Sequence, residues 1–112
     1  MQPTIIDLLT VDRRGTDGAV WSLPHGGDLD ANLVYLGPSG AVATHVNDDV
    51  DVLIVGIDGS GYVTIDSVQH ELRAGVVVAG PTRTTRSIQA CAEAELVYLT
   101  VHRAGPGVRI RQ

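Results

Sequence analysis

The chain has 112 residues, the size of one ordinary domain, and its 44% hydrophobic content can close a single core without cross-links. Its formal charge of −5 and pI near 5.1 oppose binding to phosphate backbones, so we expect no nucleic-acid partner. No apolar run approaches the roughly 20 residues needed to cross a bilayer, so we expect no membrane insertion.

Cysteine and lysine content narrow the chemistry further. The single cysteine, Cys91, has no partner for an intramolecular disulfide, and the first residues lack the basic region and the apolar run of an export signal. We therefore expect a cytoplasmic protein. All eight basic residues are arginines, which excludes a Schiff-base mechanism or a lysine general base.

The apolar residues predict strands rather than helices. Sixteen valines and seven isoleucines stand against no phenylalanine, and β-branched side chains suit the pleated surface of a sheet. Residues 2–10 fit either an edge strand or one helical turn. The other predicted strands are, in chain order, Ala19–Leu23, Leu33–Leu36, Ala41–Val46, Val50–Ile57, Tyr62–Asp66, Gln69–Leu72, Val76–Ala79, Arg86–Ala90 and Leu96–His102.

The segments between the strands carry turn signals. Residues 37–40 (GPSG) predict a tight turn, and residues 58–61 (DGSG) predict a hairpin, because paired glycines accept positive φ. Residues 47–49 (NDD) predict a solvated bend. The unbroken apolar run Val76–Ala79 predicts a strand buried on both faces. Nine or ten short strands without helical periodicity predict an antiparallel sandwich or barrel, with an immunoglobulin-like sandwich as an open alternative.

From Gly40 to about Ala90 the chain resembles the cupin superfamily, whose first motif is G-x5-H-x-H-x(3,4)-E-x6-G. Gly40 matches the first glycine with one residue fewer in the spacing, and His45 matches the first histidine. Asn47 stands where the second histidine would be, and Gly59 stands at the closing glycine. The resemblance implies one domain over residues 1–112 with an antiparallel double-stranded β-helix, the jelly-roll barrel of cupins.

The second cupin motif, G-x5-P-x-G-x2-H-x3-N, is matched in part. Gly75 and Pro81 stand at the right distance, whereas Arg83 replaces the glycine, Arg86 the histidine and Ala90 the asparagine.

The position of the family's glutamate in the first motif depends on the register. Counting back from Gly59 places Val52 there, and the shorter spacing from Asn47 places Asp51 there. We prefer Val52, because that register keeps the turn glycine aligned.

Typical cupins hold a divalent metal with three imidazoles and one carboxylate, and this chain departs from that set. Arg86 has no lone pair to donate and would place a positive charge where the cation should sit. We therefore expect no metal cofactor. In the alternative, shorter register, a metal would be held by His45, Asn47, Asp51 and His102.

A guanidinium inside a barrel needs a partner, and two interpretations of Arg86 remain open. In the structural one, Arg86 pairs with Asp51 or another carboxylate, and Arg83 lies in solvent at the rim. In the functional one, Arg86 grips the carboxylate or phosphate of a small ligand through paired hydrogen bonds. The residues predicted to bind that ligand are His45, Asn47, Arg83, Arg86, Tyr98 and His102.

Other candidate residues carry less chemistry. His25 is interpreted as a loop residue, with a lid over a pocket mouth as the alternative, and His70 as an exposed residue. Cys91 has no adjacent base and is not expected to be a catalytic thiolate.

The first functional hypothesis is a metal-free cupin-like module that binds a small polar or anionic molecule. The alternatives are a metal-dependent enzyme of the dioxygenase, isomerase or epimerase type with non-standard ligands, and a structural domain that dimerises through an edge strand. A homodimer is what the resemblance to small cupins implies.

Overall fold

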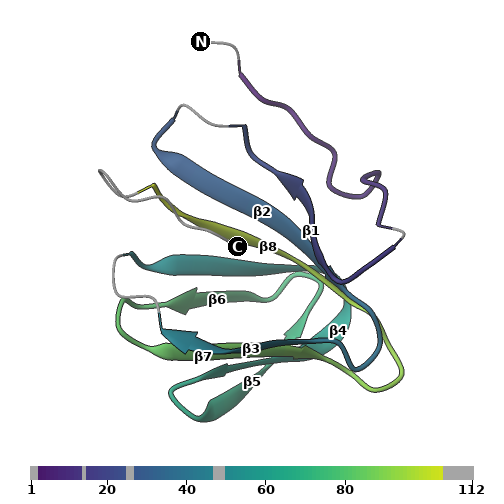
Figure 1. Ribbon diagram of the computed structural model, residues 1–112, viewed down its shortest axis with the longest axis vertical. Coiled ribbons are helices and arrows are strands. Elements are labelled where there is room, and N and C mark those ends of the chain that lie inside the picture. Colours follow the sequence, from purple (N-terminus) through teal and green to yellow (C-terminus); the bar gives the residue numbers. More distant parts are fainter. Residues whose placement is uncertain (1–2, 14, 25–26, 47–49, 105–112) are drawn as a thin grey trace.

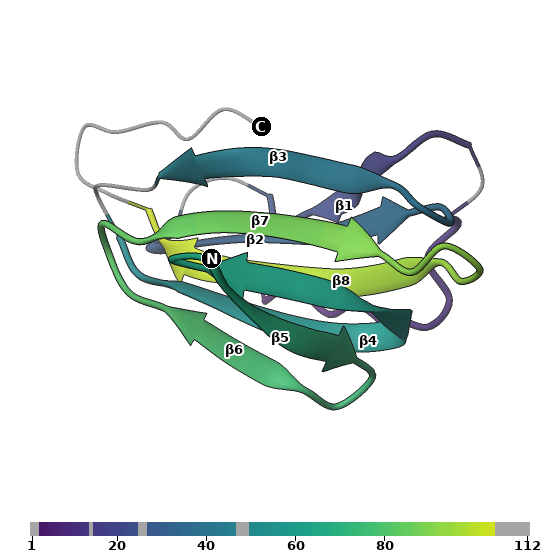
Figure 2. The ribbon, with the colours of Figure 1, turned by 90° about the horizontal axis from the view of Figure 1, so that it is seen from below.

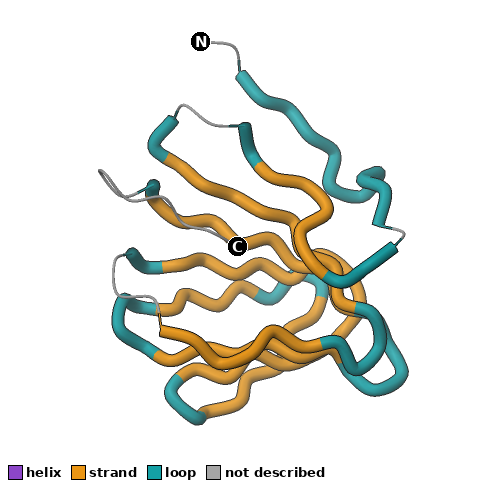
Figure 3. The backbone as a smooth tube through the Cα atoms, in the orientation of Figure 1, coloured by secondary structure: helices purple, strands orange, loops and turns teal. Residues whose placement is uncertain are grey.

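The computed structural model describes residues 3–13, 15–24, 27–46 and 50–104. These residues form eight strands and no helix (Figure 1; Figure 3). Over this part of the chain no helix is long and apolar enough to cross a membrane. The strands are β1 (Gly18–Ser22), β2 (Leu29–Leu36), β3 (Ala41–Val46), β4 (Val52–Ile65), β5 (Val68–Arg73), β6 (Val77–Gly80), β7 (Thr85–Ala90) and β8 (Leu96–Arg103).

The strands form two antiparallel sheets that share β4. In sheet A the strands lie in the order β1-β2-β8-β4-β6, and in sheet B the order is β3-β7-β4-β5. Figure 1 shows β2 and β8 of sheet A above β3, β7 and β5 of sheet B, and Figure 2 shows the same strands from below, with those of sheet B in front. The predicted antiparallel jelly-roll barrel is confirmed.

The predicted hairpin at residues 58–61 is wrong, because β4 runs unbroken from Val52 to Ile65. Its first half pairs with β8 and β6 in sheet A, and its second half pairs with β5 and β7 in sheet B. The glycines of β4 allow neighbouring backbones to come close to this strand. A Cβ atom on Gly56 would overlap the carbonyl of Arg73, and one on Gly59 would overlap the carbonyl of Glu95. The sequence predicts nine or ten strands, whereas the described residues form eight.

The apolar run at β6 is not buried on both faces, so that prediction is also wrong. β6 is an edge strand that pairs with β4 alone, and Val77 is 56% exposed on its outer side. Val78 faces inward and packs against the core. A continuous apolar run therefore does not distinguish this partly exposed edge strand from a strand that is buried on both faces.

The N-terminal arm, residues 3–13, forms neither of its two predicted alternatives. It contains no strand or helix, only a turn in which the Thr10 N–H donates to the Asp7 carbonyl at 3.1 Å. The arm is tied to the barrel by Arg13, whose Nη1 lies 2.8 Å from Asp58 Oδ2 and 3.4 Å from Glu95 Oε2. Ile5 and Leu9 on the arm are exposed.

The core lies between the two sheets and is built from the inward residues of their strands. Because side chains alternate along a strand, Val52 and Ile54 of β4 face the same interior as Leu96 and Tyr98 of β8. The buried core residues are Leu36, Val52, Ile54, Val63, Leu72, Ile88, Ala90, Leu96 and Tyr98.

Substitutions at two glycines test whether β4 depends on close contact between backbones at Gly59. Gly59 (φ +76°) and Gly75 (φ +90°) both have left-handed backbones, but only at Gly59 would a Cβ meet other atoms. Gly75→Ala should cost about 1–2 kcal/mol of unfolding free energy from backbone strain alone. Gly59→Ala should cost about 3 kcal/mol or more, because β4 and the Glu95 backbone would have to separate. Urea unfolding measures both, and equal losses would contradict this account of the strand.

Candidate functional site

Arg86 lies on the inner face of sheet B. Along β7 the alternation buries Arg86, Ile88 and Ala90 and leaves Gln89 outside. Arg86 is 9% exposed, and it is flanked by His45 of β3 and by Ile65 of β4 in the register of the sheet. Burial lowers the pKa of the Arg86 guanidinium, although arginine stays charged in proteins at any ordinary pH.

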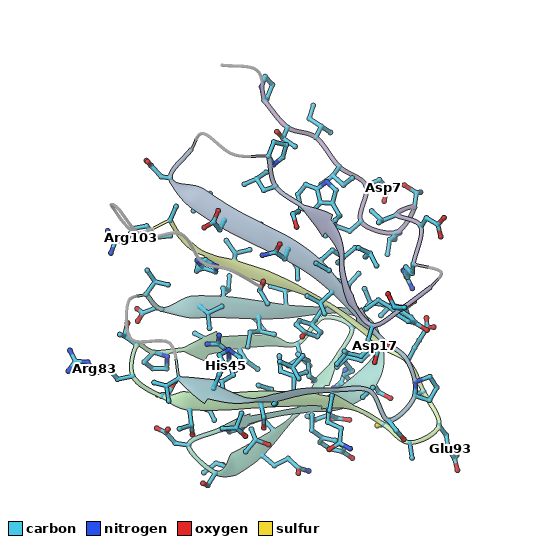
Figure 4. All side chains as sticks on the ribbon, viewed as in Figure 1. Asp7, Asp17, His45, Arg83, Glu93 and Arg103 are labelled. Atoms are coloured by element: carbon cyan, nitrogen blue, oxygen red, sulfur yellow. The ribbon has the colours of Figure 1, made fainter. Side chains whose placement is uncertain are left out.

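A bulge in β3 brings His45 to the same face as Arg86. Between Val42, which opposes Ile88, and His45, which opposes Arg86, β3 has one residue more than β7. Both Val42 and His45 can therefore face inward, although they are three residues apart. Figure 4 shows the His45 side chain rising from β3 towards the strands of sheet A.

The hydrogen bonds of His45 define its tautomer. Arg86 Nη2 lies 2.9 Å from His45 Nε2, and His45 Nδ1 lies 3.2 Å from the Ala43 carbonyl oxygen. A guanidinium only donates, so Nε2 accepts, and Nδ1 carries the proton that it donates to Ala43. The Nε2 lone pair of His45, an exposed residue of β3, is thus engaged by Arg86.

Other N–H groups of Arg86 reach solvent. Its one hydrogen bond in the described part of the chain is the one to His45, and no carboxylate there lies within ion-pair distance. No described side-chain nitrogen or oxygen that is shut off from solvent lacks a partner. The unpaired nitrogens of this buried arginine must therefore touch water.

Asp51 does not pair with Arg86, so the ion pair suggested by the structural interpretation is not formed between these two residues. Its Oδ1 accepts hydrogen bonds from the Thr82 N–H at 2.8 Å and the Thr82 hydroxyl at 2.7 Å. Both bonds lower the pKa of the exposed Asp51 carboxyl. Val52, which is 3% exposed, faces the core instead.

The inner face of sheet A presents a polar surface on β2 and β8. His102 is 7% exposed, and its Nδ1 lies 3.2 Å from the Arg103 carbonyl oxygen. Asp30 is paired with His102 across the strands, and Asn32 is paired with Thr100 on the same face. Tyr98, two residues further along β8, is 2% exposed.

Tyr98 links this surface to Arg86 electrostatically. Burial raises the pKa of the Tyr98 phenol, and the nearby positive charge of Arg86 acts in the opposite direction. The Tyr98 hydroxyl has no hydrogen-bond partner among the residues described, and the residue is 2% exposed.

Gly80 marks an apolar contact between the inner faces of the two sheets. In the register Gly80 of β6 pairs with Val52, and Ile65 pairs with Arg86. A Cβ on Gly80 would lie 3.2 Å from Val52 Cγ1 and 3.7 Å from Ile65 Cδ1, so these two inward residues of β4 lie close together.

Several predicted site residues lie elsewhere or outside the described residues. Arg83 is exposed in the turn before β7, with φ +68°, and Figure 4 shows its side chain pointing away from the barrel. Asn47 and His25 lie outside the described residues. His70 is exposed on β5, as expected. Cys91 accepts a hydrogen bond from the Ser60 hydroxyl at 3.5 Å.

The alternative metal set is not assembled in the part of the chain that is described. No group of three or more His, Cys, Asp or Glu residues there could hold a metal ion, so His45, Asp51 and His102 do not come together. Asp51 is held by Thr82 at the start of β4, on the outer side of the strand from Val52.

Asp30 and Asn32 were missed by the sequence reasoning, which began this strand at Leu33. β2 starts at Leu29, and residues 29–33 alternate apolar and polar (LDANL). That period-2 pattern is itself a strand signal, and it would have extended the strand to both residues.

Asp51 gives this region a pH dependence with a defined sign. Because Thr82 holds the folded-state pKa below the ordinary value of about 4, Asp51 stabilises the fold above that value, and the effect is lost as pH falls through the lowered pKa. Asp51→Asn should therefore lower the melting temperature at pH 7, with the difference from the wild type shrinking below pH 4. Thermal melts at several pH values measure this, with Glu93→Gln, on an exposed turn, as the control. A difference that stays constant with pH would contradict the role of the charge.

Comparisons with known proteins show where this architecture recurs. No family model matches the chain, and no curated protein matches it in sequence. Among solved structures, it is similar to an uncharacterised conserved protein with a double-stranded β-helix domain from Klebsiella pneumoniae, with TM-score 0.79, 14% identity, and 96% and 95% of the two chains covered. A protein from Thermus thermophilus has TM-score 0.77, 19% identity, and 91% and 98% coverage. A cupin protein from Bacteroides fragilis has TM-score 0.67, 18% identity, and 77% and 74% coverage.

Proposed function

Starting from the cupin fold that these similarities establish, we propose that this protein is a metal-free binding module that holds a small anion inside the barrel against Arg86. The observation that carries the proposal is a buried guanidinium whose one hydrogen bond, in the described residues, goes to an imidazole nitrogen and not to a carboxylate. A buried charge without a counter-charge is costly. A small anion would supply that counter-charge.

The chemistry of the guanidinium suits this task. Its planar fork of donors binds a carboxylate or phosphate through two parallel hydrogen bonds, which are stronger than hydrogen bonds between neutral groups. One donor of Arg86 is engaged by His45, and others reach solvent. His45 therefore positions the guanidinium and leaves donors free for the ligand.

The donor set argues against the alternative of a metal-dependent enzyme. The Nε2 lone pair of His45, which would be its inward ligand atom, already accepts from Arg86. A cation at that point would also meet the positive guanidinium, and at coordination distances the repulsion is several kcal/mol even with an effective dielectric constant of about 20.

Two arginines close in sequence allow a matched test of the anion site. Citrate, acetate, gluconate and inorganic phosphate are added in turn at equal ionic strength, and the melting temperature is measured. At 100 times its Kd an anion should stabilise the protein by about 2.7 kcal/mol, a shift of several degrees. Arg86→Gln should abolish the shift, and Arg83→Gln, on the exposed turn, should keep it. The proposal fails if no anion shifts the wild type or if Arg86→Gln responds like the wild type.

A second candidate function, a dimerisation domain, is favoured by the outer face of sheet A. Leu29 of β2, Leu53 of β4 and Val77 of β6 are 55%, 40% and 56% exposed, and all three lie on the side of the sheet that faces away from the core. Exposed apolar residues gathered on one face mark interaction surfaces. A two-fold contact with a second copy would cover the same patch on both molecules. The anion site and such a dimer are compatible.

Two valines with equal exposure test the dimer. Val77 and Val68 are each 56% exposed, but Val68 lies on β5 of sheet B, away from the outer face of sheet A. Val77→Asp should shift the protein towards the monomer in sedimentation equilibrium, because a charge would be buried in the contact. Val68→Asp should leave the dimer intact. A monomeric wild type, or equal effects of the two changes, would rule out this surface.

A further inference from the structure

The outer face of sheet A, the side that faces away from the core, is apolar across β2, β8, β4 and β6. Because side chains alternate along a strand, the residues between the inward ones share this face. One row across the sheet contains Ala31, Val101, Leu53 and Ala79, and the next row contains Leu33, Leu99, Val55 and Val77. An antiparallel sheet with one face in water usually carries polar residues there, so this face is suited to being covered.

The N-terminal arm is attached to this face at one end. Val97 lies on the outer face and is fully buried, although it is outside the core between the sheets. Its partner across the strands is Asp58, whose carboxylate holds Arg13 of the arm at 2.8 Å. Figure 1 shows the arm (purple) at the side of sheet A where β1 lies. Leu53 and Val77, further from this attachment, are exposed.

The exposed surface carries opposite charges at its two ends. Asp7 of the arm and Arg103 at the end of β8 lie at opposite ends of sheet A (Figure 4), and alternation along β8 places Arg103 on the outer face. Both side chains are exposed, and neither forms an ion pair within the described residues. Exposed apolar residues accompany each charge. Ile5 and Leu9, 90% and 69% exposed, flank Asp7 along the arm, and Leu29 is paired with Arg103 across the strands.

A turn in the arm holds the negative end in place. The Leu9 N–H donates to Asp7 Oδ1 at 3.0 Å, and the Thr10 N–H donates to the Asp7 carbonyl at 3.1 Å. These bonds order the backbone around Asp7 while its side chain stays exposed. The carboxylate is therefore presented to a partner from a preformed turn.

Such a surface is complementary to a copy of itself. When a second copy is turned end for end, about a two-fold axis that lies between the two faces and crosses the strands, the negative end of each meets the positive end of the other. A partner with a single sign of charge would be repelled at one of the two ends. The net charge of −5 also disfavours an anionic membrane surface or a nucleic acid as the cover.

We propose that two copies pack end for end through the outer faces of sheet A, with the arm of each against the end of the other that carries Leu29 and Arg103. Asp7 of one copy pairs with Arg103 of the other, and Ile5 and Leu9 cover Leu29. This rests on the dimer proposed above and adds its orientation and the segment that covers the face. The observation that carries it is the placement of two unpaired opposite charges, each beside exposed apolar residues, at the two ends of one apolar face.

Exchange of the two charges tests the orientation. Sedimentation equilibrium at low salt measures the dimer dissociation constant of Asp7→Arg, Arg103→Asp and the double variant. Each single change places like charges together twice in the two-fold dimer, so it should weaken the dimer about tenfold. The double variant restores opposite charges at both contacts and should return to within about threefold of the wild type.

Two exposed residues on turns provide matched controls. Glu93→Arg and Arg83→Asp make the same changes of charge, and Figure 4 shows both side chains on turns away from the outer face of sheet A. Neither change should alter the dimer. Circular dichroism verifies that all variants are folded.

The outcomes separate this orientation from the dimer itself. If Val77→Asp weakens the dimer but the charge reversals act no more strongly than the two controls, or the double variant does not recover, the end-for-end arrangement is wrong and the dimer through sheet A stands. If the wild type is monomeric at every concentration, both proposals fall.

Discussion

A positive charge buried between two sheets is the constraint on which the rest of the site depends. Arg86 is 9% exposed and cannot lose its charge, so the surrounding residues must offer it acceptors or water. The residues that the structure describes supply one acceptor, His45 Nε2, whose Nδ1 lies against the Ala43 carbonyl oxygen. The anion proposed above would supply the counter-charge that the described residues do not.

The fold creates this situation through β4. One strand of 14 residues belongs to both sheets, and its glycines let the backbones of Arg73 and Glu95 pass closely enough for the sheets to fold over each other. That folding places Val52 of sheet A close to Ile65, the neighbour of Arg86 in sheet B. Stability of the barrel and polarity of its interior are therefore linked through the same strand.

Much of the fold was predictable from the sequence, because short strands of valine and isoleucine separated by turn residues admit few architectures. Arg86 as an interior residue followed from the motif spacing. The course of β4 did not, because glycines that relieve backbone contacts look the same in sequence as glycines of a hairpin. Asp51 could not be excluded from the site either, since its attachment to Thr82 is a contact between distant residues.

The bulge in β3 makes the interior sensitive to residue count as well as residue type. His45 reaches Arg86 because one additional residue is accommodated between Val42 and His45. In a regular ladder, inward positions would fall on Val42 and Thr44, and the imidazole would turn outward. Insertion of a single codon between Val42 and His45 would turn the imidazole to the outer face if the bulge still absorbed only one residue, so the guanidinium would lose this acceptor without any change of side chain in the opposite sheet.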